Sequence, residues 1–157
     1  MDSSWTELAR NSSVWAAFIA WAIAQTVKMT LAWRKTREFD FHYFISTGGM
    51  PSAHSAAVCA MATSVGIRLH LDSPVFAVAL VFAIIVMFDA QSVRRAAGQQ
   101  ARLLNKIVAE LFKEHHFSKQ KLAELLGHTR LEVLFGALLG ILIALIVEWR
   151  IWPTLFP

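Results

Sequence analysis

Long apolar stretches alternate with polar, basic segments along this chain. The two longest apolar stretches run from Val14 to Trp33 and from Leu131 to Trp152. A helix rises about 1.5 Å per residue, so roughly twenty residues cross the ~30 Å hydrocarbon core of a bilayer. Each stretch therefore predicts a transmembrane helix, and Lys28 is a charged residue inside the first.

Two shorter segments between them predict further helices. The segment Pro51–Ile67 is rich in Ala, Ser, Thr and Gly, and Pro74–Asp89 contains fourteen consecutive apolar residues. Apolar runs of about 10 to 14 residues also occur in buried or re-entrant helices, so full crossing is left open for both segments. Small residues allow close helix approach in membranes, which favours an interior position for the first of the two. Its small residues include Ala56, Ala57, Ala60 and Gly66.

The segment from Arg94 to Phe117 has a different pattern. Apolar residues recur at helical spacing while charged residues occupy the other face, which predicts an amphipathic helix at the membrane surface or against the bundle. Ser118 could cap a short following helix that Gly127 ends. We therefore expect one all-α domain over residues 1–157: a polytopic membrane bundle of about four membrane-embedded helices plus an amphipathic cytoplasmic helix.

The composition supports a membrane protein. Hydrophobic residues make up 56% of the chain and charged residues 17%. The net charge is +4, and we expect the basic residues to contact membrane lipid or a phosphorylated substrate. No nucleic-acid partner is expected. The single cysteine, Cys59, excludes an intramolecular disulfide. The oligomeric state is left open, with a homo-oligomer among the alternatives.

The basic residues predict an orientation. If all four helices cross, the segments around 34–50 and 92–130 share one side and carry eleven Lys or Arg, whereas the other side carries only Arg10, Arg68 and Arg150. The positive-inside rule then makes the two long loops cytoplasmic and both termini external. A bacterial cytoplasmic membrane is the expected location, with an organelle membrane left open. Tryptophans are expected at the interfaces, unless they are ordinary core residues: Trp15, Trp149 and Trp152 outside, Trp33 inside.

Polar groups gather at the cytoplasmic ends of the predicted helices. Gly48 and Gly49 permit a tight turn before Pro51, which suits the first position of a helix. Such a helix end presents N–H groups that attract phosphate, and Ser52 adds a hydroxyl there. His54 lies in the first turn and can exchange a proton near neutral pH. The alternative is an ordinary helix start with an interfacial histidine.

The other helix ends carry complementary groups. His128 and Glu132 are four residues apart, so on a helix the carboxylate can orient the imidazole as a nucleophile or base; a plain surface contact is the alternative. Arg94 and Arg95 are planar donors suited to phosphate oxygens, or they face lipid headgroups. Lys28 and Asp89 are charges near apolar helix ends, where charges are usually functional or paired.

Three motifs make the family recognisable: "GGMPSAHSA", "DAQSVRRAAGQQARLLN" and "ELLGHTRLEVLFGALLG". They resemble the divergent branch of the type 2 phosphatidic acid phosphatases, related to acid phosphatases and vanadium-dependent haloperoxidases. The resemblance covers about Lys28 to Gly140. It implies a helical bundle in which His128 attacks phosphorus and His54 protonates the leaving oxygen. In such a bundle, Glu132 orients the His128 ring. The resemblance also implies that Lys and Arg groups bind the phosphoryl oxygens without metal or cofactor.

The sequence departs from the family pattern in four places, one of which is "AQS" at 90–92 where the family has a pair of small residues. Five residues separate Lys28 from Arg34 where the family has six, Lys121-Leu122 stands where Ser-Arg is usual, and Glu132 replaces aspartate. The leading expectation is a lipid phosphate monoester phosphatase acting on phosphatidylglycerophosphate or phosphatidic acid. The alternatives are a non-catalytic sensor or assembly factor with a retained headgroup pocket, a polyprenyl diphosphate phosphatase and, least favoured, a haloperoxidase.

Overall fold

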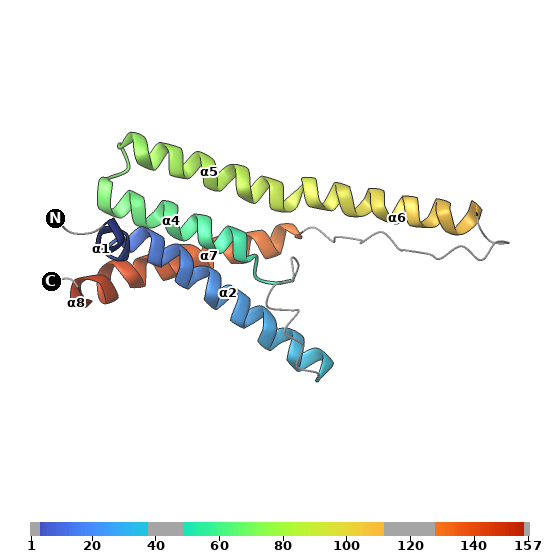
Figure 1. Ribbon diagram of the computed structural model, residues 1–157, viewed down its shortest axis with the longest axis horizontal. Helices are drawn as coiled ribbons and strands as arrows, with labels where there is room; N and C mark the ends of the chain where they lie inside the picture. Colours follow the sequence, from blue (N-terminus) through green and yellow to red (C-terminus); the bar gives the residue numbers. More distant parts are fainter. Residues whose placement is uncertain (1–3, 38–48, 112–127, 156–157) are drawn as a thin grey trace.

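The computed structural model describes residues 4–37, 49–111 and 128–155, and every regular element within these ranges is helical. The apolar helices pack side by side as a bundle, with both termini at one end of it (Figure 1). The elements are α1 (Ser4–Ala9), α2 (Ser12–Thr36), α4 (Ala53–Leu69), α5 (Pro74–Gln91), α6 (Val93–Leu111), α7 (Arg130–Ile146), the π-helical turn η1 (Val147–Ile151) and α8 (Trp152–Leu155). The expected all-α membrane bundle is confirmed.

Three stretches are long and apolar enough to cross a membrane, judged by length and composition among the described residues. They are Ser12–Arg34, Pro74–Gln91 and Arg130–Thr154. The segment beginning at Pro74 is therefore longer than its apolar run indicated. The 17 residues of α4 fall short of this length, and α4 lies between its neighbours instead. The short helix α1 was not expected from the sequence.

Side-chain caps explain where the helices begin. The Asn11 side chain accepts hydrogen bonds from the N–H groups of Ser13 and Val14, which starts α2. Ser73 caps α5, whose first position is the predicted proline. The expectation that Pro51 opens a helix is wrong. Ser52 is the N-cap and α4 begins at Ala53, because the Ser52 hydroxyl accepts the Ser55 N–H.

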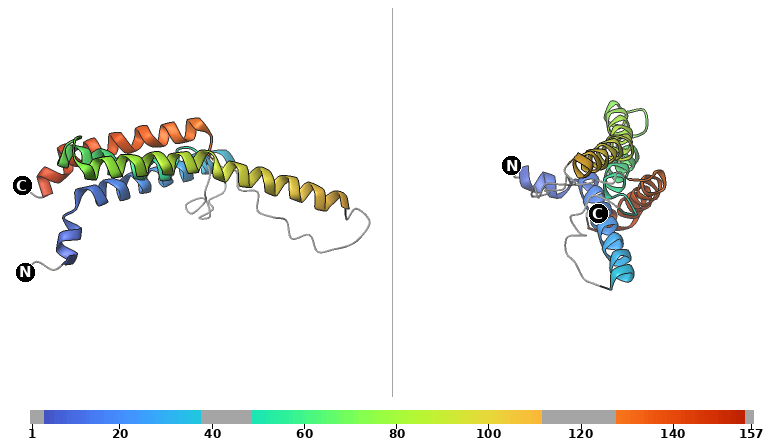
Figure 2. Two further views of the ribbon diagram at one scale, coloured as in Figure 1. Left: turned by 90° about the horizontal axis from the view of Figure 1, so that it is seen from above. Right: turned by 90° about the vertical axis from the view of Figure 1, so that its right-hand side faces the viewer.

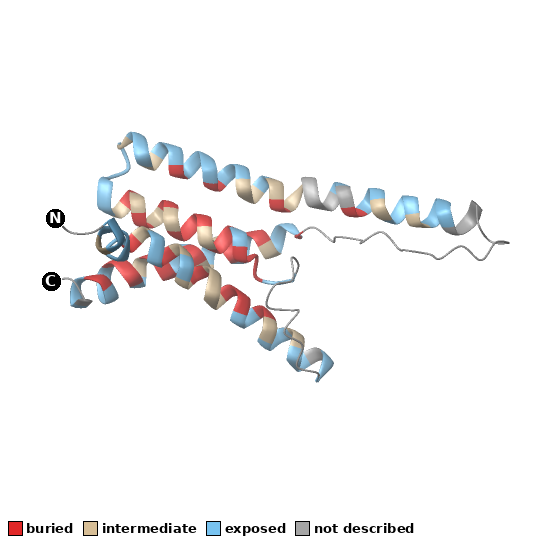
Figure 3. Cartoon of the chain, viewed as in Figure 1, coloured by how far each residue is buried: buried red, intermediate tan, exposed pale blue. Residues whose placement is uncertain are grey.

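Helix α4 is the centre of the bundle and packs against α2, α5 and α7. Figure 3 shows buried residues on several of its sides, whereas α5 is exposed along most of its length. Ala56 and Ala60 are completely buried and Gly66 is buried too. The interior position predicted from the small residues of this helix is confirmed.

Two glycines bring α7 unusually close to α4. A Cβ added at Gly136 would overlap the Ser52 carbonyl, and one added at Gly140 would overlap the Ala56 carbonyl. The spacing is the small-residue pattern that lets membrane helices pack backbone against backbone. The tight α4–α7 contact therefore fixes the start of α7 against the start of α4.

Helix α6 continues the line of α5 and projects beyond the bundle (Figure 2). Hydrogen bonds run through the junction, with Ser92 N–H donating to Phe88 O and Ala96 N–H to Ser92 O. The amphipathic helix expected over Arg94–Phe117 is confirmed over Val93–Leu111, although α6 extends away from the other helices instead of packing along them. The expected cap at Ser118 and end at Gly127 lie outside the described residues.

The tryptophans divide into two groups. Trp15, Trp33 and Trp149 are exposed, as interfacial residues would be. Trp152 is buried in the cluster formed by α2, α4 and α7, and the Arg68 guanidinium lies 5.9 Å from its ring centroid. The expectation that Trp152 faces the outer interface is wrong, because η1 and α8 turn this ring into the bundle.

The predicted orientation can be tested with single cysteines in a Cys59→Ser background. We expect Asp72→Cys, in the exposed turn between α4 and α5, to react with a membrane-impermeant thiol reagent on intact cells. Arg102→Cys, exposed on α6, should react only after the cells are permeabilised. The opposite pattern would reverse the orientation, and equal labelling of both would contradict the number of crossings.

Candidate active site

The polar groups predicted to converge lie at the end of the bundle away from the termini. The ends of α2 and α5 and the starts of α4 and α7 are found there (Figure 1). Two main-chain hydrogen bonds join them: His128 N–H donates to Ala90 O at 3.1 Å and Ser52 N–H to Glu132 O at 3.0 Å. The backbones that carry the two predicted histidine motifs are therefore linked directly.

His128 and Glu132 form the best-defined pair of this end. The His128 side chain is 3% exposed, and its Nδ1 lies 3.0 Å from Glu132 Oε2. The same carboxylate oxygen accepts the Thr129 N–H at 3.0 Å. An ionised carboxylate only accepts hydrogen bonds, so His128 Nδ1 carries the proton in this contact. In the neutral form of the ring, the lone pair is then on Nε2, the nitrogen on the side away from the carboxylate.

The local structure around this pair differs from the expected one. His128 and Glu132 were expected on one helix, but α7 begins at Arg130 and His128 precedes the N-cap. Thr129 and Glu132 form a capping box, with Glu132 N–H donating to Thr129 Oγ1 at 3.3 Å. The sequence signal for this cap is the Thr-x-x-Glu pattern, which the prediction of a continuous helix did not take into account. The capping box holds Glu132 in place, and this fixes the carboxylate that orients His128.

Lys28 lies inside the bundle near this pair. It is only 5% exposed although it is eight residues before the end of α2, about 12 Å along the axis. The Lys28 ammonium interacts electrostatically with Glu132. Gly49, with φ of +84°, covers the lysine stem, since a Cβ at this residue would lie 3.4 Å from Lys28 Cγ. The segment that precedes α4 therefore packs on the predicted phosphate-binding lysine.

Ser52 has a structural role that the sequence did not reveal. It is completely buried, and its Oγ accepts hydrogen bonds from Ser55 Oγ at 3.0 Å and Ser55 N at 3.4 Å. Both contacts use the hydroxyl oxygen as an acceptor, so the Ser52 O–H proton is still available for donation. Donation of this proton to a phosphate stays a prediction.

For the other predicted site residues, the structure describes fewer contacts or no side chain. His54 lies in the first turn of α4 with an exposed side chain. Asp89 is half-buried and precedes Ala90, the acceptor of the His128 N–H. Arg94 and Arg95 lie in the first turn of α6, but their side chains are outside the described part of the structure, as is Gly48. Their phosphate-binding roles stay predictions.

Gln25 is a polar residue at this end that the sequence analysis did not single out. It is 5% exposed and lies one turn before Lys28 on α2. Its Oε1 has no hydrogen-bond partner among the described residues. An unsatisfied buried acceptor costs about 1–3 kcal/mol, so a polar group at this depth needs a reason. Gln25 extends the buried polar side of α2 one turn further from the end of this helix than Lys28 does.

Comparisons with known proteins identify the family of this chain. The model of the Divergent PAP2 family matches residues 9–143, which includes both histidine motifs and Lys28. The chain is 42% identical over 154 residues to the "Uncharacterized membrane protein YuiD" of Bacillus subtilis (strain 168). That alignment covers 91% of this chain and 98% of the relative. No solved structure matches the chain. With a family match over most of its length and a relative at this identity, the chain belongs to the Divergent PAP2 family of membrane proteins.

Proposed function

We propose that this protein is a membrane phosphatase that hydrolyses a lipid phosphate monoester through a phosphohistidine intermediate. The observation that carries the proposal is the buried His128 imidazole, whose Nδ1 is held at 3.0 Å by Glu132 Oε2. This contact fixes the ring tautomer and leaves Nε2 as a nucleophile, the arrangement in which a carboxylate orients a catalytic histidine.

The reaction follows two balanced steps. Nε2 of His128 attacks phosphorus, a nitrogen–phosphorus bond forms, and the bond from phosphorus to the lipid oxygen breaks while His54 donates a proton to that oxygen. A water molecule then attacks the phosphohistidine, with His54 taking the water proton. The nitrogen–phosphorus bond breaks, phosphate leaves and His128 is restored.

Positive groups stabilise the charge that develops on the phosphoryl oxygens. Lys28, Arg94 and Arg95 supply cations for this purpose, and Gly48 and Gly49 with the start of α4 supply N–H groups. Donors that are fixed in place before the reaction stabilise the transition state without reorganisation, which is usually the largest contribution to catalysis. Burial of Lys28 beside Glu132 supports its place in this set.

Phosphatidylglycerophosphate and phosphatidic acid are the substrates that fit a cytoplasm-facing site. Such monoesters are presented to the inner leaflet, where the predicted orientation puts His128. The rival functions are a polyprenyl diphosphate phosphatase and a non-catalytic sensor or assembly factor. The altered spacing of Lys28 and Arg34 favours the non-catalytic rival.

Phosphate release by the purified protein in detergent tests the proposal. We expect faster hydrolysis of phosphatidylglycerophosphate or phosphatidic acid than of a polyprenyl diphosphate under matched conditions. Orthovanadate should inhibit, because the proposed site stabilises a five-coordinate centre, and a metal chelator should leave the rate unchanged. A strict requirement for Mg²⁺ would contradict the mechanism, and a preference for the diphosphate would contradict the substrate class. No release from any of these lipids would favour the sensor.

A further inference from the structure

A second polar cluster lies at the opposite end of the bundle, where the termini are. The Ser64 hydroxyl contacts Ser13 Oγ at 2.8 Å and also hydrogen-bonds to Glu148 Oε1. The Nη1 of Arg68 contacts Ser12 Oγ at 3.0 Å and Glu148 Oε2 at 3.4 Å. These contacts join α2, α4 and η1. The cluster is outside the site described above and has no part in the proposed reaction.

The π-helical turn η1 gives this cluster its carboxylate. Glu148 is buried, whereas Trp149 and Arg150, which follow it directly, are exposed. π-Helical turns are rare in proteins, and a large share of those that occur lie at functional sites. In a helix that otherwise spans the membrane, η1 points one acidic side chain inward toward Arg68.

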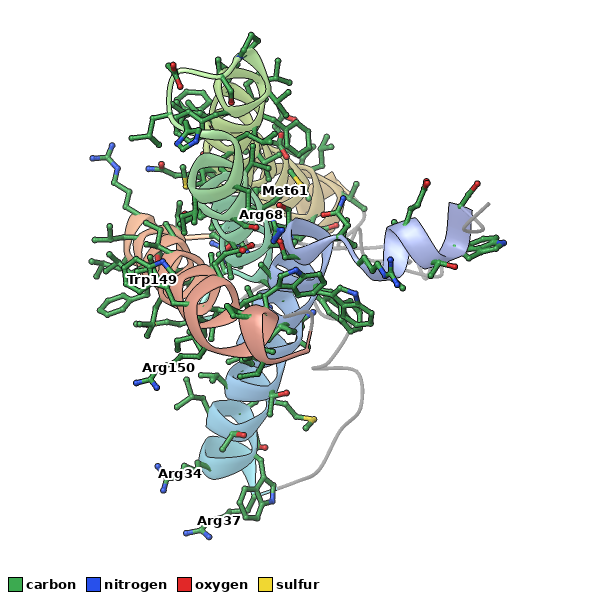
Figure 4. The ribbon with its side chains drawn as sticks, turned by 90° about the vertical axis from the view of Figure 1, so that its left-hand side faces the viewer. Arg34, Arg37, Met61, Arg68, Trp149 and Arg150 are labelled. Carbon is green, nitrogen blue, oxygen red and sulfur yellow. The ribbon has the colours of Figure 1, made fainter. Side chains whose placement is uncertain are left out.

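A cavity of about 480 Å³ opens beside Arg68, a volume typical of ligand sites. Its lining combines apolar residues, among them Met61, Val65 and Val75, with the charged residues Glu7, Arg10 and Arg68. Figure 4 views the molecule from this end, with Met61 and Arg68 on the cavity-lining side of α4 and Arg150 pointing away from them. The cavity is therefore amphipathic and lies where the helices end.

Arg68 has hydrogen-bond donors that the bundle does not use. The guanidinium carries five N–H donors, and both of its protein contacts are made by Nη1. Among the residues that the structure describes, Nε and Nη2 have no acceptor, and 43% of the side chain is exposed. Glu148 and Ser12 hold the guanidinium through Nη1, so the remaining donors are presented in a fixed plane, the geometry that suits phosphate.

The charges around the cavity balance. Among the residues that the structure describes, Arg10 and Arg68 contribute two positive charges, and Glu7 in the lining and Glu148 beside Arg68 contribute two negative charges. A neutral site that carries both positive and negative groups suits a zwitterion better than an anion. A headgroup with one phosphate and one primary ammonium matches both kinds of group, since the phosphate accepts from a guanidinium and the ammonium donates hydrogen bonds that a carboxylate accepts.

We propose that this cavity binds the headgroup of a zwitterionic phospholipid with a primary ammonium, such as phosphatidylethanolamine. Arg68 donates to the phosphate, Glu7 accepts from the ammonium, and the beginning of the acyl chains lies along Met61, Val65 and Val75. The site is at the membrane face opposite to His128, so it selects a lipid of the other leaflet and does not depend on phosphatase activity.

Native mass spectrometry of the purified protein tests this site. The protein in micelles is offered phosphatidylethanolamine, phosphatidylcholine and phosphatidylglycerol with identical acyl chains, and soluble phosphoethanolamine in a separate arm. We expect phosphatidylethanolamine to be retained about tenfold or more over phosphatidylcholine, which has the same phosphate but no ammonium N–H donors. Soluble phosphoethanolamine should compete weakly, because it lacks acyl chains. Preference for phosphatidylglycerol, or equal binding of the soluble headgroup, would overturn the proposal.

Three variants assign the two recognition elements. Glu7→Gln should bind phosphatidylethanolamine and phosphatidylcholine equally, and Arg68→Lys should lose roughly tenfold for both because it lacks the planar donors. Arg150→Lys, at the same end but outside the cavity, is the matched control and should behave as wild type. An unchanged preference in Glu7→Gln would overturn the proposal. Since Glu7 is exposed, that test holds even if Arg68→Lys does not fold.

Discussion

Replacement of His128 by asparagine should reduce phosphate release to background, a loss on the order of 10⁴ or more. Asparagine retains an amide donor that can reach toward Glu132, so the buried contact is kept while the attacking nitrogen is removed. No acid-labile, alkali-stable phosphoenzyme should form with this variant. Rapid-quench labelling with a radioactive lipid monoester measures the phosphoenzyme, and size-exclusion chromatography checks that the variant is folded.

His54→Ala is the informative comparison for that variant. A general acid matters in proportion to how poor the leaving group is, so the loss should be on the order of 10² to 10⁴ with a lipid alcohol. With a nitrophenyl ester the first step should be nearly normal and phosphohistidine should accumulate, because the base that activates water is missing. Substantial turnover by His128→Asn, or equal losses of His54→Ala with both leaving groups, would contradict the assigned roles.

Replacement of Gly140 by alanine should destabilise the bundle strongly. The added methyl group overlaps the main-chain carbonyl of Ala56, which cannot move without displacing α4. Overpacking of a close contact usually costs about 1–3 kcal/mol, and a backbone neighbour puts this change at roughly the upper limit. The free energy of unfolding in mixed micelles, followed by tryptophan fluorescence during denaturant titration, measures the loss.

Gly66→Ala is the matched control for this change, since it adds the same methyl group within the same bundle. Its close neighbours are the tips of the Phe76 and Leu71 side chains, which can turn aside. We therefore expect a loss of roughly 1 kcal/mol or less. Equal destabilisation by the two variants would mean that α4 and α7 do not approach as closely as described here.

Hydrophobic patterning predicted the helices of this protein because burial in a bilayer depends on length and apolarity. It placed the ends of helices less well. Pro51 was expected to open α4, but the Ser52 hydroxyl offers a stronger local interaction one residue later. The inward turn of Trp152 depends on η1, and a π-helical turn leaves no periodic signal in the sequence.

The sequence predicted which residues belong to the candidate site better than it predicted how these residues are arranged. Motif resemblance singled out His128, Glu132 and Lys28, and the structure puts these residues at one end of the bundle. The capping box at Thr129 was visible in the sequence but was overlooked. The burial of Gln25 and the covering of Lys28 by Gly49 depend on how distant segments pack, which local patterns do not specify.

The two carboxylates of the last membrane helix have a consequence for how the protein can move. Glu132 and Glu148 are sixteen residues apart, about 24 Å along the axis, and each is fixed to partners at its own end. A piston-like shift of one turn would carry one of them toward hydrocarbon and separate it from its partners, at a large desolvation cost. This helix therefore acts as a strut of fixed depth between the two faces of the membrane.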